Sequence, residues 1–334
     1  MIEIKHKALK NIKFIDLFAG IGAFRMALES FGAKCVFSSE WNKEAQKIYK
    51  ANYGETPSGD ITKIKESDIP KHEILCAGFP CQPFSISGKQ KGFEDTRGTL
   101  FFDIARIVKH HNPYIILLEN VKNFASHNGG KTLGVVTNTL NDLGYHVYHS
   151  ILNAADFNIP QKRERIFFVC FKKEMNILDF NFPNPITLQN HLCDFLLPDS
   201  ETKENVVYRD DVIFKDNVVE HYTNTSLRVG IINKGGQGER IYSTKGVAIT
   251  LSAYGGGAGA KTGLYLVNNK IRRLAPRECA RIMGFPDDFI IAKNKNVAYT
   301  QFGNSIVIDV LQHLLLKIVE HSEVKKWLKK RNQR

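Results

Sequence analysis

A cysteine between two prolines is the clearest chemical feature of this 334-residue chain. Cys81 lies in the sequence GFPCQPFS (residues 78–85), directly after the apolar run EILCA (residues 73–77). Because proline fixes φ and lacks a backbone donor, the strand that the apolar run predicts must end here in a rigid turn. A thiol aimed from a strand end can act as a nucleophile. A lone cysteine is more often a small packing residue, so the other motifs have to decide between the two readings.

Two further groups with possible chemistry follow predicted strands. Glu119 comes directly after the apolar run YIILL (residues 114–118). A carboxyl group at the mouth of a parallel sheet can serve as a general acid or hydrogen-bonding group, although it could also cap a helix. The sequence QKRERIF (residues 161–167) leads Arg163 and Arg165 into an apolar strand. These arginines could bind a phosphate, orient a ring carbonyl or form a surface charge cluster.

A glycine turn near the N-terminus suggests a nucleotide-like cofactor. The sequence DLFAGIGAF (residues 16–24) predicts a strand, a tight turn at Gly20 and Gly22, and the start of a helix. Such a turn lets the backbone approach a ligand at a helix N-terminus. Arg25 stands where the dinucleotide fingerprint has its third glycine. The pattern therefore favours a non-phosphorylated adenosine cofactor over a dinucleotide.

The ends of the next two segments supply matching groups. About 20 residues after the glycine turn, the next predicted strand ends in Glu40 and Trp41. The carboxylate can accept hydrogen bonds from ribose hydroxyls, and the indole can stack on a purine. The sequence GDI (residues 59–61) could hold the adenine edge. Together these residues predict a cofactor site at the carboxyl ends of the first strands.

Two segments nearly match the phosphate-binding loop of nucleotide hydrolases. They are ASHNGGKT (residues 125–132) and GGGAGAKT (residues 255–262). The first has Ala125 in place of the leading glycine, and the second has Ala260 before its lysine. Such a loop needs those glycines for its backbone cradle and a helix after it. We therefore do not expect hydrolysis of a nucleoside triphosphate.

Strand and helix patterns alternate up to about residue 170. Continuous apolar runs predict strands, and apolar positions at helical spacing predict helices. The expected strands are 13–18, 35–40, 73–78, 114–118, 147–152 and 165–171. The expected helices are 23–31, 43–52, 99–110 and 131–143. This order predicts an α/β fold with a doubly wound, mostly parallel, Rossmann-like sheet.

The composition changes after about residue 190. Residues 230–263 hold ten of the 25 glycines. Within this range, the β-rich segments 238–244 and 246–254 lie between glycine loops, and we expect both segments to be strands. Residues 194–275 are therefore expected to form a smaller β-rich domain. Helices are expected at 277–283 and 306–318, the second packing back on the first domain. The larger domain would then consist of residues 1–193 and 276–334.

Charge and composition exclude several classes of protein. The formal net charge is +12, from 46 basic and 34 acidic residues, which favours a polyanionic partner. The lysine-rich end (residues 325–334) predicts a solvated terminus. The six cysteines include no CxxC pair and no zinc spacing, so we expect a reduced cytoplasmic protein without a metal. No run of 18 apolar residues and no signal-peptide pattern are found.

Taken in order, the motifs resemble those of the DNA (cytosine-5)-methyltransferase family. The matching segments are DLFAGIG (16–22), GFPCQPFS (78–85), ENV (119–121), QKRERI (161–166), RLAPRE (273–278) and QFGNS (301–305). Six motifs in the family's order span nearly the whole chain. Departures are small: Ala23 and Ala275 stand where the family often has Gly and Thr. The segment from GGQGER (235–240) to AYGGG (253–257) resembles a bacterial member whose target is GCGC.

The resemblance implies a role for each motif. It implies that Cys81 attacks carbon 6 of a cytosine flipped out of duplex DNA. Glu119 would contact ring nitrogen 3 and the amino group, and Arg165 would orient the carbonyl oxygen with Arg163 supporting it nearby. It implies S-adenosylmethionine as cofactor. The resemblance implies that the cofactor-binding residues are Asp16, Phe18, Gly20, Ile21, Gly22, Glu40, Trp41, Asp60, Ile61, Pro80, Leu100 and Asn304. The implied DNA-binding residues are Ser87, Gln237, Arg240, Thr250, Ser252, Tyr254 and Gly257.

The same resemblance implies further properties. Residues 81–99 would form a loop that closes over the DNA. The protein would be a bacterial cytoplasmic monomer that works beside a restriction endonuclease without contacting it. Three other functions stay open: a tRNA cytosine-5 methyltransferase, a non-catalytic DNA-binding or cofactor-sensing module, and a nicotinamide oxidoreductase. Acceptor assays with duplex DNA and tRNA separate the first from a DNA enzyme.

Overall fold

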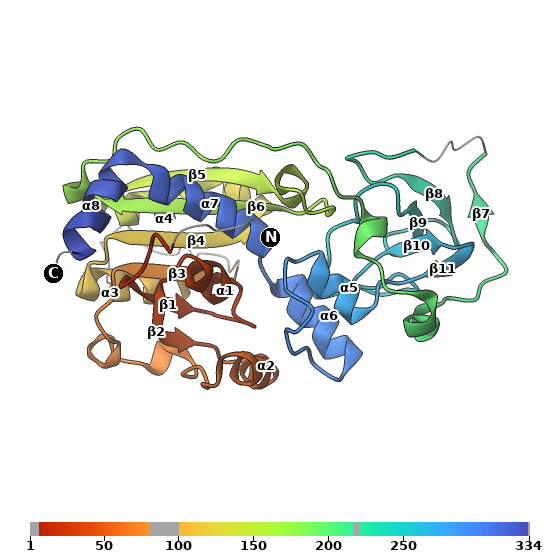
Figure 1. Ribbon diagram of the computed structural model, residues 1–334, viewed down its shortest axis with the longest axis horizontal. Helices are drawn as coiled ribbons and strands as arrows, with labels where there is room; N and C mark the ends of the chain where they lie inside the picture. Colours follow the sequence, from red (N-terminus) through yellow and green to blue (C-terminus); the bar gives the residue numbers. More distant parts are fainter. Residues whose placement is uncertain (1–6, 81–99, 217–220, 333–334) are drawn as a thin grey trace.

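The computed structural model describes residues 7–80, 100–216 and 221–332. Cys81, Ser87 and the loop expected at 81–99 lie outside the described residues. Figure 1 shows a large sheet flanked by helices, a smaller sheet at the other end, and helices α5 and α6 between the two. The two-part α/β architecture agrees with the prediction from the sequence.

The large sheet has six strands in the order β2-β1-β3-β4-β6-β5. The strands are β1 Lys13–Leu17, β2 Lys34–Ser39, β3 Ile74–Gly78, β4 Ile115–Val121, β5 Tyr145–Asn153 and β6 Glu164–Lys172. β1 to β4 pair in parallel, while β6 runs antiparallel between β4 and β5. The chain reverses its crossover direction at β1 and β3, which is where open α/β sheets bind ligands.

Helices cover both faces of this sheet because its strands are apolar on both sides. The helices of this part are α1 Ala23–Ser30, α2 Lys43–Tyr53, α3 Leu100–His111, α4 Lys131–Asp142, α7 Ile308–Glu320 and α8 Ser322–Asn332. Phe14 of β1 packs in the core that α1 and α7 share, and its neighbour Ile15 packs in the core of α3 and α4. The predicted return of a C-terminal helix to this core is confirmed by α7.

The smaller sheet has five strands in the order β11-β10-β9-β8-β7. These strands are β7 Ile213–Phe214, β8 Arg228–Ile231, β9 Arg240–Ser243, β10 Leu264–Val267 and β11 Lys270–Arg272. Val229, Ile232, Ile241 and Leu264 form a small core of their own. The sheet is followed by α5 Pro276–Arg281 and α6 Lys295–Asn304.

One expected strand is absent from the described part of the chain. Residues 246–254 make only an isolated bridge, from Ala248 to Gln161. The backbone there is held by residues of the large domain: Ala248 N donates to Pro160 O at 2.7 Å, and Leu251 N donates to the Gln161 side chain at 3.1 Å. The prediction was wrong because long-range contacts replace the ladder that a strand would need.

One apolar stretch among the described residues has the length and composition of a membrane span. It covers Lys295–Glu320, and 78% of its most apolar window is buried in the protein. The stretch comprises α6 and α7, which are separated at residues 305–307. Both helices pack into the main core through residues such as Phe302 and Leu311. The stretch therefore consists of two core helices.

Candidate active site and target-recognition segment

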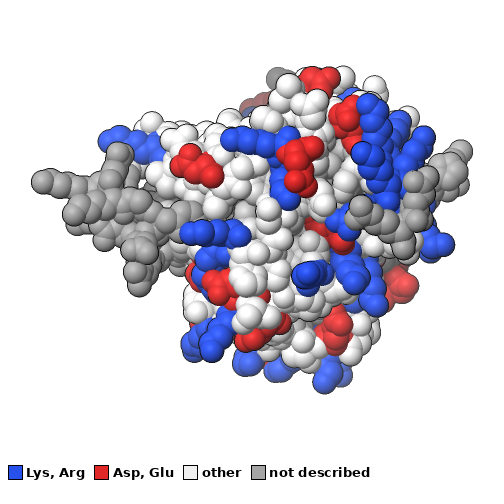
Figure 2. Space-filling view, turned by 90° about the vertical axis from the view of Figure 1, so that its left-hand side faces the viewer, with Lys and Arg blue, Asp and Glu red and all other residues white. Residues whose placement is uncertain are grey.

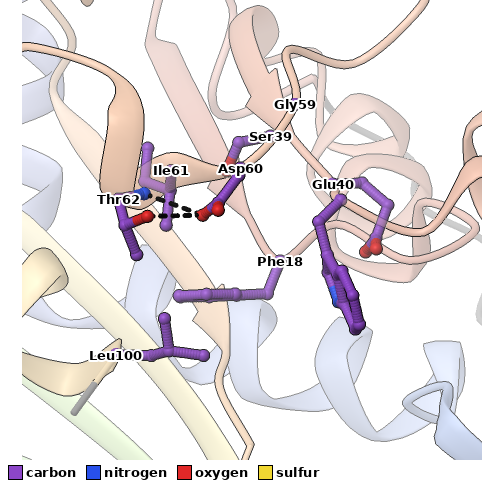
Figure 3. A pocket seen from close by; sticks show the side chains of 9 residues that line it. Phe18, Ser39, Glu40, Gly59, Asp60, Ile61, Thr62 and Leu100 are labelled. Carbon is purple, nitrogen blue, oxygen red and sulfur yellow. Dashed lines mark hydrogen bonds between the residues drawn. The ribbon is translucent and has the colours of Figure 1, made fainter. Parts of the chain in front are cut away.

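A pocket of about 190 Å³ opens at the carboxyl ends of β1 and β2. Figure 3 shows the side chains of Phe18, Glu40, Asp60 and Leu100 around one open space. The pocket is lined by Phe18, Ser39, Glu40, Trp41, Gly59, Asp60, Ile61, Thr62 and Leu100. Trp41 leaves 74% of its side-chain surface exposed, so its indole is free to stack on a planar ligand.

Glu40 joins the glycine turn to the end of β2. Its two carboxylate oxygens accept hydrogen bonds from Gly20 N at 2.8 Å and Asn42 N at 2.7 Å. Burial raises the pKa of Glu40, and backbone N–H groups from Asn42, Gly20 and Trp41 oppose that rise. The carboxylate thus fixes the shape of the turn while remaining on the pocket wall.

Asp60 lies across the pocket at the start of a short 3-10 turn, η1 Ile61–Lys63. Its Oδ1 accepts from Thr62 N at 3.1 Å and from Thr62 Oγ1 at 2.8 Å. These hydrogen bonds lower the pKa of Asp60, so the group is an anion at neutral pH. Its other oxygen, Oδ2, lies 4.0 Å from Lys63 Nζ. An ionised carboxylate here can accept hydrogen bonds from an amino or hydroxyl group.

The pocket brings together half of the twelve expected cofactor residues: Phe18, Glu40, Trp41, Asp60, Ile61 and Leu100. Gly20 adjoins it through its hydrogen bond to Glu40. Five others do not line it: Asp16, Ile21, Gly22, Pro80 and Asn304. Ser39 and Thr62 line the pocket but were missed from the sequence. Two sequence signals could have indicated them: Ser39 directly precedes Glu40, and Thr62 follows Asp60 in an Asp-x-Thr capping pattern.

Two of these expected residues have roles inside the core. Asp16 is fully buried, and burial raises the pKa of its carboxyl group to about 8. Gly22 precedes α1 with a φ of +91°, and a Cβ placed on it would lie 2.4 Å from the Tyr53 ring. Gly22 is therefore required by its conformation and by the packing of Tyr53.

The Glu119 and Arg165 side chains form an ion pair on adjacent strands. Glu119 on β4 is 8% exposed, and Arg165 Nε lies 3.2 Å from its Oε1. Burial raises the pKa of Glu119, and the positive charges of Arg165 and Arg163 act against this rise. Gly78 at the end of β3 pairs with Glu119, and a Cβ placed on it would lie 3.5 Å from the carboxylate. The carboxyl group thus lies beside the strand that leads to Cys81.

Asn120 fixes the backbone that leads to this cysteine. Its Nδ2 donates to Phe79 O at 2.9 Å, and its Oδ1 accepts from Val121 N at 2.8 Å. The Phe79 ring packs edge-on against Phe124, with ring centroids 5.5 Å apart. The sequence motif contained Asn120 but gave it no role. Its contacts show that it holds the end of β3 against β4.

Arg163 is engaged with backbone carbonyls. Its guanidinium donates to Leu251 O at 2.9 Å, Gly303 O at 2.8 Å and Ser305 O at 2.6 Å. The side chain is 2% exposed, and burial lowers the pKa of its guanidinium to about 9, with Arg165 adding to the effect. Arg163 therefore connects the start of β6 to residues 251, 303 and 305.

The expected DNA-binding residues outside 81–99 lie on loops around the smaller sheet, except Arg240, which begins β9. Gln237 precedes Gly238, which has a φ of +86°. Arg240 follows two residues after Gly238, and its Nε donates to Gly235 O at 3.1 Å. We name residues 246–262 the Gly-rich segment. Thr250, Ser252, Tyr254 and Gly257 all belong to it. Tyr254 is 80% exposed, and Thr250 Oγ1 donates to Lys162 O. Gly259 N donates to Gly238 O at 2.8 Å, which joins the two loops.

The α/β fold, with its large sheet and second, smaller sheet, is that of the C5-cytosine methyltransferases. The family model described as C-5 cytosine-specific DNA methylase matches residues 12–320, so the chain belongs to this family. It is an enzyme, a Type II DNA methyltransferase acting on cytosine carbon 5. S-adenosylmethionine use follows from the family and its fold.

Individual relatives are close. The chain is 59% identical over 318 residues to the Type II methyltransferase M.HhaI of Haemophilus parahaemolyticus, covering 95% of this chain and 97% of that protein. It is 43% identical over 311 residues to M.SsoII of Shigella sonnei, covering 92% and 80% of the two chains. Its fold is similar to that of the S. pombe Dnmt2 methyltransferase, with a TM-score of 0.72, 21% identity and coverage of 92% and 98%.

Proposed function

We propose that this protein methylates carbon 5 of the inner cytosine in GCGC duplexes, as the modification enzyme of a restriction-modification system. The observation that carries the chemistry is the ion pair between the buried Glu119 and the partly buried Arg165, beside the strand that leads to Cys81. The target sequence rests on the 59% identity to M.HhaI and on the Gly-rich segment. Both the site residues and the target are open to direct test.

The reaction begins with the thiolate of Cys81, because only this form is nucleophilic. It adds to carbon 6 of the cytosine, forming a carbon–sulfur bond and placing electron density on carbon 5. The raised pKa of Glu119 favours its protonated form, which can donate a hydrogen bond to ring nitrogen 3 as charge develops there. Arg165 orients the ring carbonyl oxygen. Carbon 5 would take the methyl group from S-adenosylmethionine, leaving the thioether S-adenosylhomocysteine. Carbon 5 would then lose its proton to a base as the thiolate leaves carbon 6.

The pocket at β1 and β2 suits S-adenosylmethionine, which supplies an electrophilic methyl group. The exposed Trp41 would stack on the adenine, and Glu40 would accept hydrogen bonds from the ribose hydroxyls. The ionised Asp60 would accept a hydrogen bond from the adenine amino group. Phe18 and Leu100 close the apolar side of the pocket. Pro80 and Asn304 would lie at the rim of the same site.

Access to the base requires that it leave the duplex, at a cost of a few kcal/mol. We propose that Gln237 fills the vacated space from one side and Ser87 from the other. Arg240 would read a guanine through two hydrogen bonds. Ser252, Tyr254 and Gly257 would complete recognition, and Thr250 would contact a phosphate. Residues 194–275 would then be the target-recognition domain, and residues 1–193 with 276–334 the catalytic domain.

We further propose a cytoplasmic monomer in a bacterium, with double-stranded DNA as its partner and no membrane association. A cognate restriction endonuclease would share its target without binding to it. A protein that modifies host DNA must act where that DNA is, which supports the cytoplasmic location.

The deciding experiment is transfer of labelled methyl from S-adenosylmethionine to two duplexes, one with a single GCGC and one with that site scrambled. Digestion of the product locates 5-methylcytosine. Label at the inner cytosine of the first duplex alone is expected. Label in both duplexes would retain the chemistry and refute the target. Label in neither, with cofactor binding intact, would redirect the search to tRNA as acceptor or to a non-catalytic role.

Cys81→Ala tests the nucleophile. Methyl transfer should fall below detection, because no other group would form the bond to carbon 6, while equilibrium dialysis shows unchanged cofactor affinity. Glu323→Ala, which breaks an ion pair with Lys326 on α8, is the control and should keep its turnover. Residual turnover of Cys81→Ala above a few per cent of the wild-type rate would remove this cysteine from its proposed role.

A further inference from the structure

Helix α6 approaches the Gly-rich segment more closely than a side chain would allow. A Cβ placed on Gly303 would lie 2.2 Å from Ala253 N and 2.4 Å from the carbonyl carbon of Ser252. Gly303 lies inside α6 and has no left-handed φ. Its backbone conformation is therefore open to any residue, and only the contact with the Gly-rich segment demands glycine.

Side chains fix the same contact. Lys261 Nζ donates to Thr300 Oγ1 at 2.8 Å and to Asn296 O at 3.2 Å, so the lysine of the second phosphate-loop-like segment is bound to α6. Thr300 Oγ1 lies 3.4 Å from Ala253 O. Arg163 donates to carbonyls on both sides, at Leu251 and Gly303. Lys261, Ala253 and, through Arg163, Leu251 of the Gly-rich segment are thereby joined to one helix.

The opposite side of α6 rests on the cofactor side of the large domain. Gln301 Nε2 donates to Glu44 O at 3.1 Å, in the first turn of α2, which follows Trp41. Asn52 at the end of α2 exchanges two hydrogen bonds with the backbone of Ile290, at 2.9 and 2.8 Å. Figure 1 shows α6 between the part with α2 and the smaller sheet. The helix α6 therefore contacts both α2, which follows the pocket residue Trp41, and the Gly-rich segment.

We propose that Gly303 is a specificity-determining position, because it lets α6 hold the Gly-rich segment in the position that target reading requires. This inference rests on the proposed function. A methyl group at position 303 must move the segment by roughly 1 Å, the difference between 2.2 Å and an ordinary contact of 3.4 Å. A displacement of this size can reduce a rate about 100-fold even when it lies away from the reacting atoms.

The test is Gly303→Ala, assayed for kcat/KM on the GCGC duplex and on a duplex with one base pair of the site changed. We expect kcat/KM on GCGC to fall about 100-fold and the ratio between the two duplexes to fall at least 10-fold. Cofactor affinity without DNA should stay within about twofold, since α2 and its contact with Gln301 are unchanged. A variant with an unchanged ratio, or with cofactor affinity lost to the same extent, would overturn the proposal.

Gly134→Ala is the matched control. Gly134 also lies inside a helix, α4, and a Cβ placed on it meets nothing within 4 Å. This change should leave both kinetic constants and their ratio unaltered. The wild-type protein on the GCGC duplex reports on the proposed function itself, so a failure there is distinct from a failure of this inference.

Two milder variants cover the case in which Gly303→Ala does not fold. Thr300→Val and Lys261→Met remove hydrogen bonds of the same contact without adding a clash. Each should lower the discrimination ratio in the same direction, by about threefold to tenfold. If both keep the wild-type ratio within about twofold, the contact with α6 does not determine specificity and the proposal is wrong.

Discussion

At the scale of single residues, burial decides which carboxyl groups are ionised. Burial raises the pKa of Asp16 to about 8 despite Arg25 nearby, and Glu40 adds to the rise. An unfolded chain releases this proton near pH 4, so between pH 4 and 8 the folded protein binds more protons than the unfolded chain. The contribution of Asp16 to the free energy of unfolding is therefore greatest at low pH and declines as pH rises.

The substitution Asp16→Asn should remove this dependence because the amide stays neutral. The free energy of unfolding of the variant, minus that of the wild type, should increase from pH 5 to pH 8, by at most about 1.4 kcal/mol per pH unit. Urea unfolding at three pH values measures it. Asp60→Asn is the control, since hydrogen bonds lower the pKa of Asp60 and it titrates below this range. A constant difference for Asp16→Asn would contradict a buried neutral carboxyl group.

At the scale of elements, a buried ion pair joins β11 to α5. Arg272 Nη2 lies 2.7 Å from Glu278 Oε1, and the two side chains are 2% and 0% exposed. Glu278 also accepts hydrogen bonds from Leu197 N at 2.8 Å and Ala275 N at 2.6 Å. One carboxylate thus fixes the strand, the start of the helix and the chain that enters the smaller domain.

Arg272→Met should destabilise the protein by about 3–5 kcal/mol, because it leaves the Glu278 charge buried without its partner. Lys47→Met breaks a pair with Glu44 whose side chains are 68% and 51% exposed, and should cost less than about 1 kcal/mol. Thermal and chemical unfolding of the two variants provide the comparison. Equal losses in both would show that burial does not set the strength of the Arg272 pair.

At the scale of the whole molecule, positive charge is not confined to the proposed DNA-binding surface. Helix α8 carries four exposed lysines: Lys325, Lys326, Lys329 and Lys330. In Figure 1, α8 lies at the end of the molecule opposite the smaller sheet. Figure 2 shows this end facing the viewer, and its basic side chains are densest on the right. Val324 and Leu328 bury the other side of the helix. The predicted solvated terminus is thus an ordered, packed helix with a solvated face.

Changing these four lysines to glutamine should leave specific DNA binding and its salt dependence unchanged, because they lie far from the Gly-rich segment. Lys234→Gln, beside the turn that carries Gln237, should make the slope of log K against log salt shallower by about 0.9, as for one lost phosphate contact. Fluorescence anisotropy at four salt concentrations measures both slopes. A shallower slope for the α8 variant would assign a DNA contact to this far end.

Local sequence patterns were sufficient to predict the large sheet and most of the helices that flank it. Apolar runs and helical spacing predicted the parallel strands and flanking helices. Each element buries one or both faces, and the spacing of apolar residues over a short stretch of sequence shows which faces these are. The strand-end motifs predicted Glu40, Trp41 and Asp60 for one pocket, since carboxyl ends of parallel strands meet at one edge. The motif order also indicated the family that the comparisons show.

Only the tertiary structure decided what the residues between these motifs do. Asp16 is buried in the core and does not line the pocket. Residues 246–254 form an isolated bridge in place of a strand. The guanidinium of Arg163 donates to three backbone carbonyls. The helix α6, which was not predicted, proved to hold the Gly-rich segment. The partners of Arg163 are 88 to 142 residues away along the chain. Sequence patterns record which faces of an element are apolar, whereas such distant contacts exist only after the two sheets and the helices between them have packed together.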